Sequence, residues 1–162
     1  MIGEQLRIGT GFDVHRLETG RTLVLGGVIV PHALGLAGHS DADVLTHAII
    51  DALLGGASLG DIGRLFPDTD AAYKNISSLI LLERVRIQLK ENGLSIINVD
   101  AVVMAEKPRL APYIPAMIQA LAKALEIDVE CIGIKATTTE QLGFVGREEG
   151  IAAQAVALLN RK

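Results

Sequence analysis

Along this chain, hydrophobic stretches typical of β-strands alternate with stretches in which hydrophobic residues recur at helical spacing. Stretches rich in apolar and β-branched residues, which predict strands, lie at residues 6–17, 22–31, 95–106, 131–138 and 150–160. Apolar residues recur at helical spacing between them, at residues 40–55, 76–93 and 113–127. Residues 150–160 are rich in Ala and Leu and also fit a helix. The alternation predicts an α+β fold with helices on one face of a four-stranded-type sheet, in a single domain over residues 1–162.

Turn and capping residues indicate where the predicted elements begin and end. Ser40 is a good N-cap for the first helix, whose acidic first turn suits the helix dipole. The glycine pair at 55–56 is expected to end that helix. The glycine pair at 26–27 predicts a hairpin, bulge or bend within an apolar run. Residues 64–75 are turn-rich and long enough to form a functional loop.

The composition indicates how the predicted sheet is covered. Of the 162 residues, 49% are hydrophobic but 3% are aromatic, so aliphatic side chains must build the core. Because so much aliphatic surface belongs to a chain of modest length, we expect part of it to be buried between subunits. The sheet face that the helices leave open should therefore be apolar and available to a partner subunit.

Charge, cysteine content and the first residues limit the class of protein. The net charge of −4 argues against a general nucleic-acid or membrane binder, while local basic spots for phosphates are still allowed. Cys131 is the one cysteine of the sequence, which excludes an internal disulfide framework and fits a reducing compartment. Residues 1–9 lack the apolar run of a secretory signal, and no run of about 18 apolar residues is present to span a bilayer. We therefore expect a cytoplasmic protein.

A carboxylate and two histidines form the first candidate site. Asp13 and His15 stand two residues apart in a predicted strand, so both side chains are expected on one face. His47 lies among apolar neighbours in the first predicted helix, where a hydrogen-bonded core histidine is the common case. The three side chains would suit Zn²⁺ with one open position, although the spacing supports an ordinary hydrogen-bonded cluster about equally. Asp51, one turn after His47, is a candidate acceptor that would fix its tautomer.

A second candidate site is the segment before the first predicted helix. Residues 38–40 precede its N-terminus, where free backbone N–H groups favour an anion such as phosphate. His39, just outside the cap, could donate to a phosphate oxygen. Plain helix capping by Ser40 is the alternative and is compatible with either role.

The glycine-containing segment at residues 60–70 is a third candidate. Its glycines and proline allow tight bends that bring the backbone close to a ligand. Asp61, Asp68 and Asp70 are crowded there, more than solubility would require. A solvated turn is the alternative, and for Asp70 it is the favoured one.

Residues 135–150 combine hydroxyls, charges and glycines. Three consecutive threonines at the end of a predicted strand are followed by Glu140, and Arg147 lies in a glycine-flanked loop. Hydroxyls and a carboxylate in one turn suit a phosphate with a hard divalent cation such as Mg²⁺ or Mn²⁺. A capping box from Thr137 to Glu140 is the alternative.

Several common catalytic motifs are missing from the sequence. It contains no GxxxxGK[ST] phosphate loop, no GxGxxG dinucleotide motif, no Ser/His/Asp order and no reactive-cysteine signature. An enzyme with a nucleophilic side chain is therefore disfavoured. The candidate segments together indicate a phosphorylated substrate held by metal and backbone amides.

Five blocks of the sequence resemble a known family. They are GFDVHRL, LGGVIVPHALGLAGHSDADVLTHAIIDALLGG, LGDIGRLFPDTD, VDAVVMAEKPRLAPYI and KATTTEQLGFVGREEGIAA. In this order they are similar to the 2-C-methyl-D-erythritol 2,4-cyclodiphosphate synthase family of the non-mevalonate isoprenoid pathway, from about Ile8 to Leu159. Ala42 departs from the small residue, often Gly, that the family carries there, and Glu148 stands at a variable position.

The resemblance implies a reaction and its metals. The family converts 4-diphosphocytidyl-2-C-methyl-D-erythritol 2-phosphate to the cyclic diphosphate and CMP, by attack of the 2-phosphate on the β-phosphorus. Its zinc ligands fall on Asp13, His15 and His47. Its Mg²⁺ or Mn²⁺ ligand falls on Glu140, which acts with the substrate phosphates.

The resemblance also implies the residues that act on the substrate. The catalytic residues implied are His39, Thr138 and Glu140. The substrate-binding residues implied are Asp13, His15, His39, Ser40, Asp61, Ile62, Gly63, Phe66, Asp68, Asp70, Ala105, Glu106, Lys107, Pro108, Arg109, Leu110, Ala111, Thr137, Thr138, Thr139, Glu140, Phe144 and Arg147. Among them, residues 105–111 would bind cytosine, with an ordinary surface turn as the alternative.

The family forms a homotrimer with active sites between subunits, and the resemblance carries this over as an expectation. Phe12, Arg147 and Glu149 match residues around a central channel that can bind isoprenoid diphosphates. The alternatives are that Phe12 belongs to the core and that Arg147 and Glu149 form a plain ion pair between subunits. Two other classes stay open on the residues alone. A metal-dependent phosphohydrolase would suit the same three ligands, and a trimeric binding protein with structural zinc would suit the oligomer but normally needs four protein ligands.

Overall fold

The structure, a computed structural model, describes residues 6–161. The first five residues, where the sequence predicts no secretory signal, lie outside this range. The strands are β1 (Leu6–Glu18), β2 (Val24–Leu25), β3 (Val28–Ile29), β4 (Gly35–Leu36), β5 (Leu94–Met104), β6 (Ile132–Thr137) and β7 (Gly150–Arg161). The helices are α1 (Val44–Ala57), α2 (Ile62–Leu65), α3 (Ser78–Glu91), α4 (Ile114–Leu125) and α5 (Gly143–Gly146), with 3₁₀ turns η2 (Ala71–Tyr73), η3 (Ala111–Tyr113) and η4 (Val129–Cys131).

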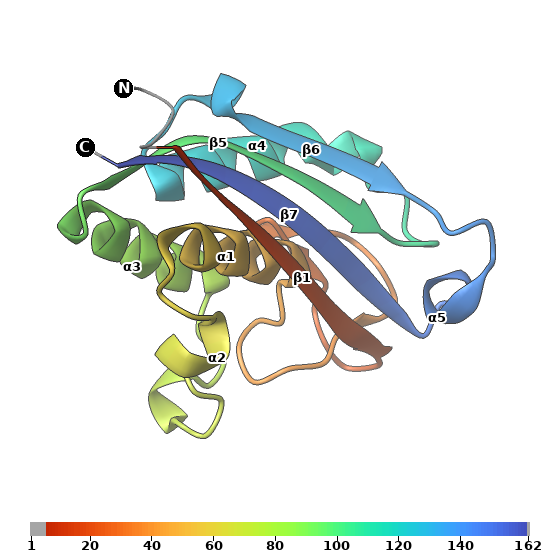
Figure 1. Cartoon of the computed structure of the whole chain (residues 1–162). Helices are drawn as coiled ribbons and strands as arrows, with labels where there is room; N and C mark the ends of the chain where they lie inside the picture. The colour runs from red at the N-terminus through yellow and green to blue at the C-terminus, as the bar shows by residue number, and fades with distance from the viewer. Residues whose placement is uncertain (1–5, 162) are drawn as a thin grey trace.

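The predicted α+β fold is confirmed, and β7 occupies the middle of its main sheet. In residues 6–161 this sheet has five strands in the order β4-β1-β7-β5-β6, one more than predicted, because the two-residue β4 pairs with the end of β1. β5 and β6 are parallel, and the other pairs are antiparallel (Figure 1). The helical alternative for residues 150–160 is therefore wrong, since pairing on both sides holds them extended. The glycine pair at 26–27 makes the turn of the β2–β3 hairpin, with φ of 57° and 73°.

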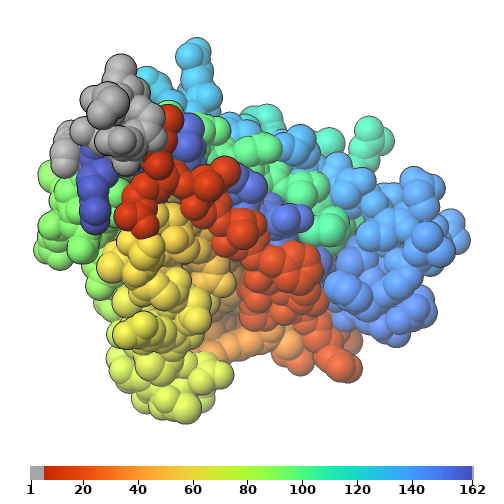
Figure 2. Space-filling model, viewed as in Figure 1, coloured from red at the N-terminus to blue at the C-terminus, as the bar shows by residue number. Residues whose placement is uncertain are grey.

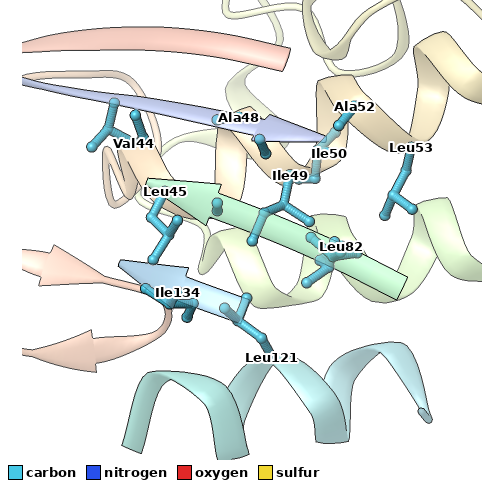
Figure 3. Packing of buried hydrophobic residues seen from close by; sticks show 14 of the residues in the cluster. Val44, Leu45, Ala48, Ile49, Ile50, Ala52, Leu53, Leu82, Leu121 and Ile134 are labelled. Atoms are coloured by element: carbon cyan, nitrogen blue, oxygen red, sulfur yellow. The ribbon is translucent and has the colours of Figure 1, made fainter. Parts of the chain in front are cut away.

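Helices α1, α3 and α4 cover one face of this sheet, as predicted. Leu45 of α1, Leu82 of α3, Leu121 of α4 and Ile134 of β6 belong to one buried cluster. Figure 3 shows side chains from these four elements meeting in it. Aliphatic residues make this core, in agreement with the low aromatic content. No helix within residues 6–161 is both long and apolar enough to cross a membrane.

The ends of α1 differ from the prediction. Asp43, not Ser40, is the N-cap, and it accepts hydrogen bonds from the backbone of Gly26, Gly27 and Thr46. The acidic residues expected in the first turn thus precede the helix. The helix also continues through the glycine pair at 55–56 to Ala57, and Gly56 allows close packing against β1 rather than ending the helix. A Cβ at Gly9 of β1 would lie 2.3 Å from the nitrogen of Gly56.

The opposite face of the sheet carries exposed apolar side chains. Even-numbered residues of β1 point to this face, and Ile8 and Phe12 are 72% and 58% exposed. Val156 of β7 is also exposed, and it lies two residues before Leu158, which pairs with Ile8. In Figure 2 the atoms of β1, in red, lie at the surface across the middle of the molecule. The sequence expectation that this second face is apolar is therefore confirmed.

Candidate metal centre and adjoining cavities

Asp13, His15 and His47 meet at one point between β1 and α1. The two β1 side chains share a face of the strand, as their spacing predicted, and α1 packs on that face. Asp13 Oδ2 lies 2.9 Å from His15 Nε2 and 3.1 Å from His47 Nδ1. The two imidazole nitrogens lie 3.1 Å from each other. Three possible ligand atoms therefore surround one point from different directions.

The outer hydrogen bonds of the two histidines show that their inner nitrogens can act as ligands. His15 Nδ1 lies 2.6 Å from the carbonyl oxygen of Ala37, which can only accept, so Nδ1 carries the hydrogen and Nε2 keeps its lone pair. His47 Nε2 lies 2.8 Å from Ser78 Oγ and 3.1 Å from Ser40 Oγ. With its hydrogen on Nε2, His47 likewise directs a lone pair inward from Nδ1. A carboxylate and two imidazole lone pairs at these distances fit a cation such as Zn²⁺.

The electrostatics of the three residues agree with this arrangement. Burial alone would raise the pKa of Asp13, but hydrogen bonds and charge interactions with His15 and His47 outweigh it and lower that pKa far below 3.8. Burial would lower the pKa of His15, but the hydrogen bond that protonated His15 donates to Asp13, together with the charge of Asp13, raises that pKa above 6.5. A positive charge is therefore stabilised between these side chains, whether a proton or a metal ion carries it.

The centre lies on the wall of a cavity of about 390 Å³, called here the metal cavity. Its lining comprises Asp13, His15, Gly38, His39, Ser40, His47, Ile62, Gly63, Phe66, Asp68, Tyr73 and Leu81. The structure thus brings together predicted residues from each of the first three candidate segments. Helix α2 and the turn after it project from the body of the molecule (Figure 1) and form one side of this cavity. A metal ion here would have an open side toward a small polar ligand.

Two lining residues of the metal cavity were missed in the sequence. Tyr73 follows a turn-rich stretch and packs edge-on against Phe66, with 5.4 Å between ring centroids. An aromatic pair seven residues apart in a loop was the available signal. Leu81 belongs to the apolar side of α3, and its pattern does not distinguish a cavity wall from the core.

Two predicted aspartates serve the backbone instead of lining this cavity. Asp61 caps α2 by accepting from the backbone of Arg64, and Asp70 caps η2 by accepting from Ala72. The carbonyl oxygen of Asp70 lies 3.1 Å from His39 Nε2, so Asp70 does contact a cavity residue. The solvated-turn alternative for Asp70 matches its exposure.

Two expectations about α1 are wrong. Residues 38–40 do not sit at the helix N-terminus, because α1 begins at Val44, and Ser40 instead contacts His47 and accepts from the backbone of Ala42. Asp51 does not orient His47. Its carboxylate accepts from the backbone N–H of Ile62 at 2.7 Å, which fixes α2, and burial raises its pKa.

A second cavity, called here the turn cavity, has a volume of about 370 Å³. Its lining comprises Ala105, Glu106, Pro108, Arg109, Leu110, Ala111, Ala136, Thr137 and Thr138. Residues 105–111 and the end of β6 therefore form one pocket, as the resemblance implied. Lys107 points elsewhere and forms an ion pair with Glu148 at 2.9 Å.

The remaining predicted residues lie beside the turn cavity on an exposed loop. Thr138 Oγ1 accepts from the backbone of Glu140 at 3.3 Å and contacts its carboxylate at 3.4 Å. Thr137 Oγ1 donates instead to the carbonyl oxygen of Thr138, so the alternative of a capping box from Thr137 to Glu140 is wrong. Thr139 bonds to the carbonyl oxygen of Leu142. Arg147 pairs with Glu149 of the same chain, whereas the alternative expected this ion pair between subunits. Phe144 borders a separate cavity beside Glu149.

An α+β fold with three possible metal ligands beside an open cavity fits the class of metal-dependent enzymes, because structural zinc is normally closed by four protein ligands. The sequence pattern of the YgbB family matches residues 6–160, and the chain belongs to this family. This confirms the resemblance predicted from the sequence.

Known relatives and solved structures agree with that membership. The chain is 60% identical to the 2-C-methyl-D-erythritol 2,4-cyclodiphosphate synthase of Desulforamulus reducens, over 96% of this chain and 99% of the relative. It is 62% identical to the synthase of Agathobacter rectalis, over 95% of this chain and 87% of the relative. The IspF of Plasmodium falciparum, solved as a CDP complex, superposes with a TM-score of 0.86 at 34% identity, covering 98% and 97% of the two chains.

A longer protein contains a similar unit. The bifunctional IspDF of Campylobacter jejuni superposes with a TM-score of 0.94 at 45% identity. The match covers 98% of this chain and 43% of that protein. The chain therefore corresponds to less than half of the bifunctional protein.

Proposed function

We propose that this chain converts 4-diphosphocytidyl-2-C-methyl-D-erythritol 2-phosphate to 2-C-methyl-D-erythritol 2,4-cyclodiphosphate and CMP, in isoprenoid precursor biosynthesis. The observation that carries the proposal is the convergence of Asp13, His15 and His47 in the wall of the metal cavity, in a chain 60% identical to a cyclodiphosphate synthase. That cavity also holds His39, Ser40 and Asp68, polar groups suited to a phosphorylated polyol.

The reaction needs positioning more than chemical activation. An oxygen of the 2-phosphate forms a new bond to the β-phosphorus, and the bond from that phosphorus to the oxygen bridging to the α-phosphorus breaks. The electron pair leaves with CMP. Because the attacking phosphate is already anionic, no side chain acts as nucleophile, and holding both phosphates in line supplies much of the rate enhancement.

Metal ions would supply charge neutralisation. Asp13, His15 and His47 would hold Zn²⁺, and Glu140 with the substrate phosphates would hold Mg²⁺ or Mn²⁺; when bound, these ions polarise the diphosphate and balance its charge. The chain's own groups act around them. His39 and Ser40 hold the 2-phosphate, Thr138 contacts the diphosphate, and Asp68 orients the hydroxyls of the methylerythritol.

The cytidine would bind in the turn cavity. Its lining offers backbone groups of Ala105, Leu110 and their neighbours and a ring from Pro108, which suit the edge and face of a pyrimidine. The phosphates would run past Thr137, Thr138, Thr139 and Glu140. Phe144 and Arg147 would lie at the outer edge of the bound substrate.

The active unit would be a homotrimer, with each site built at a subunit interface. The exposed Ile8, Phe12 and Val14 supply an apolar surface that a neighbouring copy would bury. A neighbour's turn cavity would then complete the metal cavity of this chain. The single domain over residues 1–162 and the cytoplasmic location stay predictions.

A phosphorus NMR time course tests the proposal. The purified protein is incubated with the diphosphocytidyl substrate, Zn²⁺ and Mg²⁺. We expect two coupled cyclic-diphosphate resonances that appear together with CMP. Free inorganic phosphate would instead identify a metal-dependent phosphohydrolase, and unchanged substrate with bound metal would favour a non-catalytic binding protein.

A further inference from the structure

Ser78, the first residue of α3, stands between a metal-binding histidine and a carboxylate. Its side chain is fully buried. Its hydroxyl oxygen lies 2.8 Å from His47 Nε2 and within hydrogen-bond distance of Asp41 Oδ1. The backbone N–H of Ser78 also donates to Asp41 Oδ2 at 3.0 Å.

The donors and acceptors of this chain of contacts have one consistent assignment. An ionised Asp41 can only accept, so the hydroxyl hydrogen of Ser78 points to Asp41. The oxygen of Ser78 is then free to accept, and the hydrogen of His47 must lie on Nε2. His47 Nδ1 is left with its lone pair directed at Asp13 and His15. Ser40 Oγ, 3.1 Å from the same Nε2, already accepts from Ala42 and is the longer contact.

The same contacts tie the wall of the metal cavity to its metal centre. The N–H of Asp41 donates to the carbonyl oxygen of Ile76 at 3.0 Å, and that of Asn75 donates to the carbonyl oxygen of His39 at 2.8 Å. The segment at 39–41 is thereby held against the segment at 75–78. Ser77, the N-cap of α3, makes no capping bond with its own side chain, so the carboxylate of Asp41 satisfies the start of this helix.

We propose that Asp41 and Ser78 are positioning residues that fix the tautomer and ring orientation of His47 and thereby set the metal affinity of the centre. The proposal rests on the metal centre proposed above and assigns its outer support to residues of the 39–41 and 75–78 segments. Outer hydrogen-bond partners of metal ligands commonly contribute about 10- to 100-fold to metal affinity. An effect of that size is expected here.

Zinc affinity measured by competition with a chromophoric chelator tests this role without substrate. Ser78→Ala removes the nearer acceptor for His47 Nε2–H but keeps the backbone N–H that Asp41 caps. We expect zinc binding to weaken about 10- to 100-fold. Ser77→Ala is the matched control, since it removes a neighbouring hydroxyl whose side chain makes no capping bond, and its zinc affinity should equal that of the unaltered chain.

Asp41→Asn should reverse the direction of the hydrogen bonds that run between residue 41, Ser78 and His47. An amide can donate to Ser78 Oγ, which leaves the serine hydroxyl to donate to His47 Nε2 and moves the imidazole hydrogen to Nδ1. Long-range ¹H–¹⁵N spectra of the metal-free protein report this tautomer directly. We expect a shift of His47 toward the Nδ1–H form in Asp41→Asn, with no such shift in Ser77→Ala.

A second pair of variants covers a failure of Ser78→Ala to fold. Ser78→Thr and Ser78→Val have nearly the same shape and differ in the hydroxyl, so Thr should bind zinc more tightly than Val. Equal zinc affinities in this pair, or in Ser78→Ala and Ser77→Ala, would overturn the proposal. Unaltered protein that binds zinc and shows these differences, but forms no cyclic diphosphate, would support the positioning role and reject the proposed reaction. Cyclic diphosphate formation without these differences would do the reverse.

Discussion

The metal cavity and the turn cavity differ in how firmly the fold holds their functional side chains. Around the metal centre, His15 and His47 are held by contacts that join β1, α1, α3 and the segment at residues 37–40. At the turn cavity, Thr138 and Glu140 are exposed, and their hydrogen bonds reach no further than two residues along the chain. One site is therefore rigid before any ligand binds, while the other presents groups that a ligand or partner must order.

Removing a metal ligand is expected to have the largest effect on this comparison. His47→Ala should abolish zinc binding, and losing several kcal/mol of charge stabilisation lowers kcat/KM by about 10³-fold or more. Zinc content by elemental analysis and turnover by phosphorus NMR check this together. His32→Ala, in the loop between β3 and β4, is the control. Near-normal turnover of His47→Ala would remove His47 from the zinc site.

The next largest effect concerns the strand that carries Asp13 and His15. In Gly11→Ala the new Cβ would lie 2.0 Å from the carbonyl oxygen of Ala48, so β1 and α1 must move apart. Overpacking of this kind costs about 1–3 kcal/mol of unfolding free energy, and backbone contact places Gly11 at the upper end. Denaturant unfolding measures the loss, and zinc affinity should fall with it because the ligands separate.

Gly55→Ala is the matched control for Gly11→Ala. Its Cβ would meet the carbonyl oxygen of Thr10 at 3.6 Å, an ordinary contact, on an exposed position of α1. Alanine is favoured over glycine in a helix interior by about 0.5–1 kcal/mol, so this variant should be more stable than the unaltered chain. Equal stability losses in the two variants would show that close packing of β1 on α1 is not the cause.

A smaller effect is expected at the turn cavity. Glu140→Gln removes an exposed charge, so unfolding free energy should stay within about 0.5 kcal/mol. Loss of one metal contact that stabilises the transition state by about 1.4 kcal/mol should lower kcat/KM tenfold at limiting Mg²⁺. A Mg²⁺ titration of activity measures this, with Glu130→Gln as control. A titration curve identical to that of the unaltered chain would contradict the metal-binding role of Glu140.

The smallest expected effect is a pH dependence at the metal centre. The raised pKa of His15 means that its proton stabilises the metal-free fold below 6.5, and that this stabilisation is lost as pH rises through the raised pKa. The lowered pKa of Asp13 adds stability above 3.8, which is lost as pH falls through the lowered value. Asp13 and His15 should therefore stabilise the metal-free fold together at pH values between 3.8 and 6.5.

Zinc-loaded protein should respond in the opposite sense. Protons compete with zinc for His15, so zinc affinity should fall as pH drops below the raised pKa of His15. Thermal midpoints of the metal-free protein and zinc titrations, each across this range, provide the two measurements. Parallel pH profiles for metal-free stability and zinc affinity would contradict the shared site.

Features with a short period in the sequence were predicted well. The two-residue spacing of Asp13 and His15 placed both on one face of β1, and helical spacing identified α1, α3 and α4. Residues 150–160 were assigned to a strand against a competing helical pattern, and tertiary pairing decided it. These predictions succeeded because the spacing of hydrophobic residues within a strand or helix determines which side of that element is buried.

Features that depend on distant contacts were not predictable in the same way. Asp43 caps α1 because it also accepts from Gly26 and Gly27, a contact that no local pattern reveals. Asp51 has helical spacing to His47 but bonds to Ile62 instead. Ser78 supports His47 from a helix that begins 31 positions later in the chain. Such roles depend on how distant segments pack together, and this packing is determined by many residues at once rather than by a local sequence pattern.

The pairing of β1 with β7 also has a consequence for how the protein is made. Leu6 pairs with Asn160, so the strand that carries Asp13 and His15 lacks its main neighbour until residues 150–161 have left the ribosome. Contacts between segments so distant in sequence form late in folding, because loop closure costs entropy that other contacts must first offset. We therefore expect the metal ligands to reach their final arrangement only after β7 has been translated, so that metal binds a chain that already contains this strand.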